Sequence, residues 1–130
     1  MSDEKRFKAI ATADAPAAIG PYSQGFACGD LLFVSGQLPL DPATGEFVAG
    51  GIEEMTHQVI KNTRAIARAA GTDLNRAVKT TIFLTDLANF AAVNEVYAQY
   101  FTETLPARAV VQVAALPKGD EIEMESIVQL

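Results

Sequence analysis

The sequence predicts an α+β protein, a two-layer arrangement in which two helices pack on one face of a mixed sheet of about six strands. The first observation is that apolar residues recur at helical spacing in only two stretches, near residues 52–70 and 90–101. Strand-like segments lie before, between and after them. The second observation is that both helical stretches are amphipathic, so each buries one side against the sheet. The other face of the sheet is therefore left free to meet another subunit.

Length and composition fit this architecture. The chain has 130 residues, of which 49% are hydrophobic and 20% are charged. These values exclude intrinsic disorder and suit a single domain covering residues 1–130, which can bury a core without disulfides or metal. The chain carries 10 Lys and Arg against 16 Asp and Glu, and a net charge of −6 repels phosphate backbones. We find no local basic patch to offset this charge, so we expect no nucleic-acid partner.

The single cysteine and the single histidine point to no redox or metal chemistry. Cys28 cannot form an intrachain disulfide, and its place in an apolar hairpin strand favours a buried structural thiol. His57 cannot complete a zinc site with one thiol, and it lies off the apolar stripe of its helix, so a solvated position is expected. The charged N-terminus is followed by no apolar run, and no apolar stretch approaches the ~20 residues that span a bilayer. We expect a cytoplasmic protein without a membrane partner.

The N-terminal part predicts strands and turns. Residues 7–11 read as a short edge strand, and residues 26–28 and 31–34 flank Gly29-Asp30 at the spacing of a tight hairpin. A second turn follows at residues 41–45, where Pro42 presets φ and Gly45 is free to take a positive φ.

The two helices are separated by one strand. The first helix begins at Ile52, and Gly71 is placed to end it. Residues 78–84 are short and rich in β-branched side chains, which indicates a strand. Asp86 is expected to cap the second helix and Pro106 to stop it. The two apolar stripes are Ile52, Met55, Val59, Thr63, Ile66 and Ala70 in the first helix, and Phe90, Val93, Tyr97 and Phe101 in the second.

The C-terminal part returns to strands. Residues 108–116 form a nearly continuous apolar run, which is typical of a central strand covered on both faces. A turn at residues 117–120 follows. The strict alternation over residues 121–125 places Glu123 and Glu125 on one face of the last strand.

Arg108 is the most informative residue, because it opens the most apolar strand. A guanidinium cannot lose its proton, and burying it without an anionic partner costs several kcal/mol. Two partners are compatible with the sequence at about equal weight. One is a structural ion pair with Glu123 or Glu125; the other is a substrate carboxylate held by two parallel hydrogen bonds.

Other polar positions carry a similar choice. Glu123 either lies on a solvated sheet face or activates a water molecule. Tyr22 either packs as a loop aromatic or faces a site. Ser35-Gly36 is either a simple turn or a source of backbone N–H groups for an anion. Asn94 lies beside the apolar stripe of the second helix, where an amide needs a specific partner. The serine-hydrolase elbow, the phosphate-binding glycine loop and the metalloprotease motif are all absent from the sequence.

Several short blocks, taken together and in order, give the sequence a specific resemblance. They are Pro16-Ala17-Ala18-Ile19-Gly20-Pro21-Tyr22-Ser23-Gln24, Val34-Ser35-Gly36-Gln37-Leu38-Pro39-Leu40-Asp41-Pro42, Val93-Asn94-Glu95-Val96-Tyr97, Pro106-Ala107-Arg108, Ala115-Leu116-Pro117-Lys118-Gly119 and Ile122-Glu123-Met124-Glu125. On these residues the chain resembles the RidA/YjgF family of reactive-intermediate deaminases, also called L-PSP endoribonucleases. The resemblance covers residues 15–127.

The resemblance implies a chorismate-mutase-like fold, a homotrimer with a pocket at each subunit interface, and hydrolysis of 2-imino or enamine acids to 2-oxo acids and ammonia. The small ligands are thus 2-imino and 2-oxo acids such as 2-iminobutanoate and 2-iminopropanoate. No metal and no organic cofactor is required, because an iminium carbon is already electrophilic. The resemblance also implies roles for seven residues: catalytic Arg108, Glu123 and Tyr22, and substrate-binding Ser35, Gly36, Asn94 and the backbone of Val110, where other members carry cysteine.

Two other functions stay open at this point. One is an endoribonuclease or translation inhibitor, which needs a cationic surface and an acid–base pair near a 2′-hydroxyl. The other is a non-catalytic trimer that binds small carboxylates or acts like a chaperone through the same clefts. The net charge of −6 disfavours the endoribonuclease. Release of ammonia would distinguish a deaminase from the non-catalytic trimer.

Overall fold

The computed structural model describes residues 6–130, so the charged segment at residues 1–5, on which the N-terminal prediction rests, lies outside the described residues. The elements follow in the order β1 (Phe7–Ile10), β2 (Gly25–Cys28), β3 (Leu31–Gln37), α1 (Ile52–Ala69), η2 (Leu74–Arg76), β4 (Ala77–Leu84), η3 (Leu87–Asn89), α2 (Phe90–Tyr100), β5 (Ala107–Gln112), η4 (Pro117–Gly119) and β6 (Ile122–Gln129). No helix among these residues is long and apolar enough to cross a membrane.

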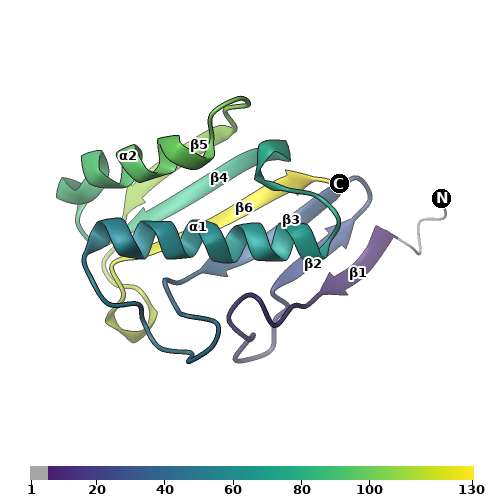
Figure 1. Ribbon diagram of the computed structural model, residues 1–130, viewed down its shortest axis with the longest axis horizontal. Coiled ribbons are helices and arrows are strands. Elements are labelled where there is room, and N and C mark those ends of the chain that lie inside the picture. Colours follow the sequence, from purple (N-terminus) through teal and green to yellow (C-terminus); the bar gives the residue numbers. More distant parts are fainter. Residues whose placement is uncertain (1–5) are drawn as a thin grey trace.

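The strands form one mixed sheet with the order β1-β2-β3-β6-β4-β5. All neighbours are antiparallel except β4 and β5, which run parallel because α2 provides the crossover between them. Both α-helices cover the same face of this sheet (Figure 1). The predicted fold class is therefore confirmed, with six strands and two α-helices in two layers.

The core lies between the helices and the sheet. Alternate residues of β6, among them Ile122 and Met124, are fully buried on the helix side, whereas Glu123 and Glu125 face the opposite side. Ile60 and Ile66 of α1 are also fully buried against this layer. The sheet face that carries Glu123 is not covered by a helix, and we call it the open face (Figure 1).

Most of the predicted boundaries are confirmed. β1 lies at an edge of the sheet, and β2 and β3 form a hairpin around Gly29, whose φ of 59° suits glycine. α1 begins at Ile52 and ends just before Gly71, as expected. The second helix differs in detail. Asp86 caps the 3-10 turn η3 that leads into α2, and α2 ends at Tyr100, six residues before Pro106.

The prediction of a central C-terminal strand was wrong. The strand β5 stops at Gln112 and lies at an edge of the sheet, bonded only to β4 among the described strands. The apolar run misled the prediction because part of it is exposed in the single chain: Val111 is 41% exposed on the open face. An edge strand with apolar side chains and free backbone groups is a surface that another chain can cover.

Two predictions about single residues were also wrong. Cys28 is exposed, because it ends the short strand β2 next to the hairpin turn and points away from the core. His57 is half-buried, and its Nδ1 lies 2.6 Å from the hydroxyl oxygen of Tyr100 in α2. Helical spacing alone hid this contact, because the partner comes from the neighbouring helix.

Asp120 introduces a buried carboxyl group just before β6. The residue is 5% exposed; its Oδ1 accepts a hydrogen bond of 2.7 Å from the backbone N–H of Glu121, and its Oδ2 has no partner among the described residues. Burial raises the pKa of Asp120 from 3.8 to about 6, against the opposing effect of backbone N–H groups.

We therefore expect Asp120→Asn to stabilise the protein at neutral pH. The pKa of Asp120 in the folded protein lies above the ordinary value, so the protonated side chain is the form that the fold favours. Its contribution to the free energy of unfolding is complete below pH 3.8 and is lost as the pH rises through about 6. The variant should exceed wild type by roughly 1–3 kcal/mol in free energy of unfolding at pH 7.5, with little difference at pH 4. Urea unfolding at both pH values measures this, and a difference independent of pH would contradict it.

Candidate active site

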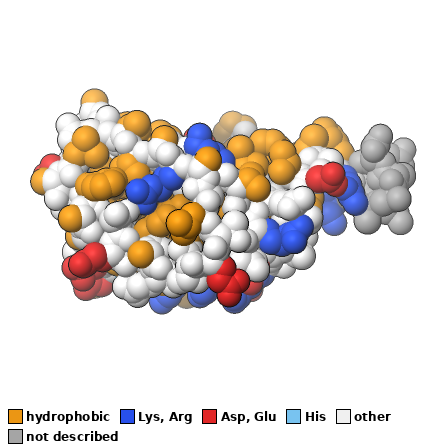
Figure 2. All heavy atoms as spheres, turned by 90° about the horizontal axis from the view of Figure 1, so that it is seen from above, with side chains coloured by type: hydrophobic (Ala, Val, Ile, Leu, Met, Phe, Trp, Pro, Cys, Tyr) orange, Lys and Arg blue, Asp and Glu red, His pale blue; other side chains and the backbone are white. Residues whose placement is uncertain are grey.

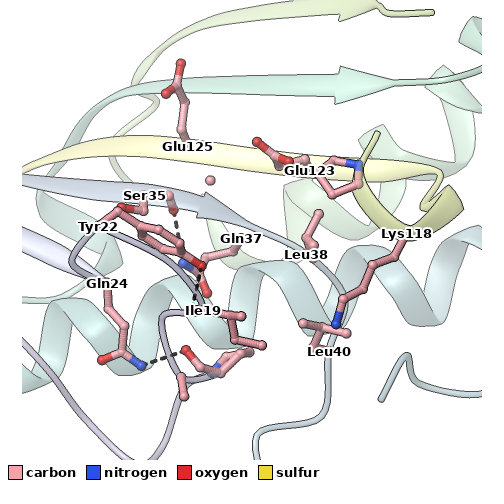
Figure 3. A pocket seen from close by; sticks show the side chains of 14 residues that line it. Ile19, Tyr22, Gln24, Ser35, Gln37, Leu38, Leu40, Lys118, Glu123 and Glu125 are labelled. Carbon is pink, nitrogen blue, oxygen red and sulfur yellow. Dashed lines mark hydrogen bonds between the residues drawn. The ribbon is translucent and has the colours of Figure 1, made fainter. Parts of the chain in front are cut away.

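The first part of the candidate site is a cavity of about 550 Å³ on the open face, which we call the Glu123 cavity (Figure 3). It lies where β3, β6 and the loop before β2 meet. In Figure 3, Glu123 and Glu125 project from β6 away from the helices, while Tyr22 and Ser35 approach from the loop and from β3. Its lining includes Pro16, Ile19, Tyr22, Gln24, Ser35, Gly36, Leu38, Lys118, Glu123 and Glu125.

Local structure fixes the polar groups of this cavity. The hydroxyl of Ser35 donates a hydrogen bond of 2.5 Å to the backbone carbonyl of Ser23, which ties β3 to the loop. The hydroxyl oxygen of Tyr22 accepts a 3.3 Å hydrogen bond from the backbone N–H of Ile19, and Tyr22 as a residue is 52% exposed. The ring is thus oriented by its own loop while one side stays accessible.

Gly36 makes room for the carboxylate. It lies at the bulge where the pairing of β3 with β6 shifts register. A Cβ atom built on Gly36 would collide with the carboxyl group of Glu123. Only glycine therefore allows the Glu123 side chain to lie across β3 at this point.

Glu123 is a half-buried carboxylate with altered proton affinity. Burial, and secondarily the negative charge of Glu125, raise the pKa of Glu123 above its ordinary value. A carboxylate of this kind is a stronger base than one in water, as a water-activating residue requires. The ion pairs seen among residues 6–130 join Arg6 to Asp30 and Arg68 to Asp73, and neither involves Glu123.

The second part of the site surrounds Arg108, on the helix side of the sheet. One guanidinium nitrogen, Nη1, donates a 2.7 Å hydrogen bond to Oδ1 of Asn94. The guanidinium carbon lies 4.8 Å from the ring centre of Tyr97 and 5.6 Å from that of Phe90. The recess beside it has a volume of about 320 Å³, and we call it the Arg108 recess. It is lined by Asn94, Tyr97, Ala98, Phe101, Leu105, Pro106 and Arg108.

The register of the sheet places Arg108 and Glu123 on opposite faces. Arg108 is aligned with Thr80, which is fully buried on the helix side. Glu123 is aligned with Phe83, and Phe83 with Val111, on the open face. Within one chain the two charged groups therefore belong to different surfaces, and no ion pair joins Arg108 to Glu123 or Glu125 among the described residues.

Six of the seven residues singled out in the sequence thus fall into two groups. The structure brings Tyr22, Ser35, Gly36 and Glu123 together in one cavity. It brings Asn94 and Arg108 together at the other surface. Val110 belongs to neither group: its side chain is partly buried and packs against the core on the helix side of β5.

Sequence reasoning missed three contributors. Gln24 is 5% exposed, and its amide group bonds the backbone of Thr12, Ala15 and Pro16, which shapes the loop above the cavity. Lys118 lines the same cavity from η4. Tyr97 lies under Arg108 but was seen only as a member of the apolar stripe of its helix. Of these three residues, only Gln24 could have been found from the sequence, because an amide that follows a loop of mostly small residues is a candidate for bonding the backbone of that loop.

The expectation that the chain has no local basic patch needs correction. Lys61, Arg64 and Arg68 line one groove of about 420 Å³ on α1, together with Thr12 and Asp14. Their spacing of three and four residues places them on one helix face. Arg68 is paired with Asp73 at 3.1 Å, so the net charge of the groove is modest. Among the described residues no group of His, Cys, Asp and Glu is suited to hold a metal ion.

Comparison with known proteins assigns the family. A sequence model of the endoribonuclease L-PSP family matches residues 12–130. A RutC family protein of Sinorhizobium fredii is 58% identical over 121 residues, which cover 93% of this chain and 96% of that protein. The mouse protein named 2-iminobutanoate/2-iminopropanoate deaminase is 51% identical over 120 residues, covering 92% of this chain and 89% of the mouse protein. The chain therefore belongs to the endoribonuclease L-PSP family, also called RidA/YjgF.

Solved structures agree. The YjgF protein of E. coli superposes with a TM-score of 0.90 at 48% identity, covering 94% of this chain and 98% of YjgF. The structure of E. coli TdcF with bound serine gives a TM-score of 0.91 at 45% identity, covering 95% of this chain and 98% of TdcF. The resemblance found in the sequence is thus confirmed for both family and fold.

Proposed function

We propose that this protein is a cytoplasmic enzyme that hydrolyses reactive 2-imino and enamine acids, such as 2-iminobutanoate and 2-iminopropanoate, to 2-oxo acids and ammonia. One observation carries the proposal: a half-buried carboxylate, Glu123, and a guanidinium, Arg108, each face a recess without neutralising each other. Hydrolysis of an imino acid needs those two groups, an anchor for a carboxylate and a base for water. The mouse relative carries the name of this activity.

The proposed active site is completed by a second subunit. Arg108 and Glu123 lie on opposite faces of the sheet, so one chain alone cannot present both to one small substrate. Seen from above, hydrophobic side chains gather around basic groups over the edge formed by α2 and β5 (Figure 2). Phe90, Leu105 and Val111 are exposed large hydrophobic residues there. We propose that this edge packs against the open face of a neighbour in a homotrimer, bringing the neighbour's Glu123 cavity opposite Arg108.

The proposed reaction needs few groups. The substrate carboxylate accepts hydrogen bonds from Arg108, which places C2 of the iminium near Glu123. A water oxygen adds to C2 while the water proton moves to the Glu123 carboxylate, giving a carbinolamine. Glu123 then returns the proton to the amino group. The C–N bond breaks and ammonia leaves while the carbinolamine hydroxyl gives its proton to the Glu123 carboxylate, so that C2 becomes the carbonyl carbon of the 2-oxo acid. Glu123 passes this proton to the departing ammonia, which leaves as ammonium and returns the carboxylate to its starting state. Ser35, Gly36 and Tyr22 shape the side of the cavity where the water lies, and the Val110 backbone helps place it.

The deciding experiment measures loss of 2-iminobutanoate generated in situ by an amino-acid oxidase, with semicarbazide as the trap. We expect wild-type protein to decrease the trapped imine and increase 2-oxobutanoate in proportion to protein concentration. Light scattering should give three times the chain mass of 13.8 kDa. Unchanged imine trapping with a correctly assembled trimer would overturn the deaminase proposal.

The same preparation distinguishes the alternatives. A non-catalytic carboxylate-binding trimer would bind 2-oxobutanoate without accelerating imine loss. An endoribonuclease would cleave RNA with a rate that falls steeply with salt, and replacement of Lys61 and Arg64 by Gln in the α1 groove would weaken RNA binding. Imine turnover unaffected by those two substitutions would favour the deaminase.

A further inference from the structure

A short chain of contacts lies beneath the Arg108 guanidinium and reaches into the core. The Tyr97 ring is 4.8 Å from the guanidinium carbon and only 7% exposed. Its hydroxyl oxygen lies 2.7 Å from Oγ1 of Thr80, which is fully buried in β4. Phe101 stacks on the Tyr97 ring with centroids 4.2 Å apart and an interplanar angle of 23°.

These contacts hold Tyr97 at two places. Stacking on Phe101 fixes the plane of the ring, and the bond to Thr80 fixes where the hydroxyl end lies. Thr80 belongs to β4, next to the strand that carries Arg108, and the two residues are aligned in the sheet. The position of Tyr97 is therefore set by the sheet and by buried Phe101, the residue that directly follows α2, and does not depend on the exposed residues 102–105.

Arg108 itself has less support of its own. It is exposed, on an edge strand, and its guanidinium makes one hydrogen bond to the described residues 6–130, to Asn94. An arginine side chain has several rotatable bonds and a large rotamer entropy, so one hydrogen bond does not define the orientation of the guanidinium plane. A flat aromatic face beneath the guanidinium does define it, while leaving the N–H groups at its edge free to donate.

We propose that Tyr97, held by Thr80, is the positioning residue that orients the Arg108 guanidinium for a carboxylate ligand. The inference rests on the proposed function for its catalytic consequence, but the orientation of Arg108 is measurable without turnover. Neither Tyr97 nor Thr80 needs to touch the substrate. Tyr97 presents its ring to Arg108, and Thr80 acts one step further away through the Tyr97 hydroxyl.

The expected results form a graded series. Tyr97→Leu removes the ring and should raise KM for the imino acid by roughly 3-fold to 30-fold, the range expected for a lost cation–π contact, with kcat within about twofold of wild type. Tyr97→Phe and Thr80→Val each remove the same hydrogen bond and should raise KM by a smaller, equal factor. The double variant Tyr97→Phe/Thr80→Val should match either single variant, since both changes break one interaction.

NMR gives the reading that is independent of activity. The Nε–H signal of Arg108 is assigned by its absence in Arg108→Ala. It should show an ordered guanidinium group in wild type and a more mobile one in Tyr97→Leu, Tyr97→Phe and Thr80→Val. The matched control is Tyr100→Phe, which removes another hydroxyl of α2 that contacts His57. It should leave KM and the Arg108 signal unchanged.

The outcomes separate the two proposals. Lack of imine turnover in wild type, together with a looser Arg108 in the Tyr97 and Thr80 variants, would remove the deaminase and keep the positioning role. If Tyr97→Phe and Thr80→Val fold and both the Arg108 signal and KM equal those of wild type, the positioning role is overturned and the deaminase proposal is unaffected. If Tyr97→Leu fails to fold, the two milder variants decide the question.

Discussion

Arg108→Ala is expected to lower kcat/KM for 2-iminobutanoate by about 100-fold or more while leaving the protein folded. The proposed anchor makes two charge-assisted hydrogen bonds to the substrate carboxylate, and each such bond contributes roughly 1.5–3 kcal/mol. Arg108 is exposed and has no ion-pair partner among Glu123 and Glu125, so its loss should change the free energy of unfolding by about 1 kcal/mol or less. Steady-state kinetics and urea unfolding measure the two effects.

A matched control is available on the first helix. Arg64 lies over the Tyr100 ring at 5.6 Å, much as Arg108 lies over Tyr97, but outside both parts of the candidate site. Arg64→Ala should retain wild-type kcat/KM. Arg108→Lys should recover only a small part of the lost activity, because an ammonium group keeps the charge without the planar fork. If Arg108→Ala instead dissociates or melts, with activity proportional to the folded fraction, Arg108 has a structural role at the subunit contact.

The sequence predicted the architecture because the fold depends on periodic burial. The alternation of Ile122 and Met124 with Glu123 and Glu125 gave the orientation of β6 correctly, and the helical stripe with Gly71 gave α1. Both patterns show which side of a helix or strand faces the core. Because the core between the helices and the sheet is built by a single chain, its sequence alone was enough to predict these elements.

The error at β5 has the same physical origin. An apolar run reports that side chains avoid water, but it does not say whether the covering surface belongs to the same chain. In the single chain β5 is an edge strand, and Val111 and Leu105 are exposed at 41% and 74%. An apolar strand at the edge of the sheet can therefore have the same sequence pattern as one in the core.

The candidate site shows what periodicity cannot provide. Arg108 was noticed as a charge that opens an apolar strand, Glu123 as a carboxylate on one face of the last strand, and the family resemblance implied a role for each. Their placement on opposite faces, however, required the register of β4 with β5 and β6. Tyr97 was hidden because its role depends on two groups from other elements, Thr80 and Arg108. Long-range pairings of this kind leave no local signal.

Glu123→Gln is the second decisive variant, and it should separate binding from chemistry. Glutamine preserves the shape of the side chain and its fit beside Gly36, but it cannot accept the water proton. We expect kcat to fall by roughly 100-fold or more, at the lower end of the usual contribution of a general base, with KM within about threefold of wild type. Loss of the buried charge should leave stability unchanged or slightly raised at neutral pH, because burial raises the pKa of Glu123.

The control is Glu121→Gln, which removes an exposed carboxylate two residues away, outside the Glu123 cavity. It should behave as wild type. Wild-type turnover in Glu123→Gln would remove Glu123 from the mechanism, and equal losses in both variants would indicate a general electrostatic effect.

Co-expression of the two inactive variants then tests which chains build one site. If each site takes Glu123 from one subunit and Arg108 from its neighbour, mixed trimers of Arg108→Ala and Glu123→Gln chains contain some sites with both native groups, and activity returns. If both groups served the same substrate from one chain, no mixture could restore a complete site. The opposite faces occupied by Arg108 and Glu123 make recovery the expected result. An inactive mixture, shown by mass spectrometry to contain mixed trimers, would require a different assembly of the site.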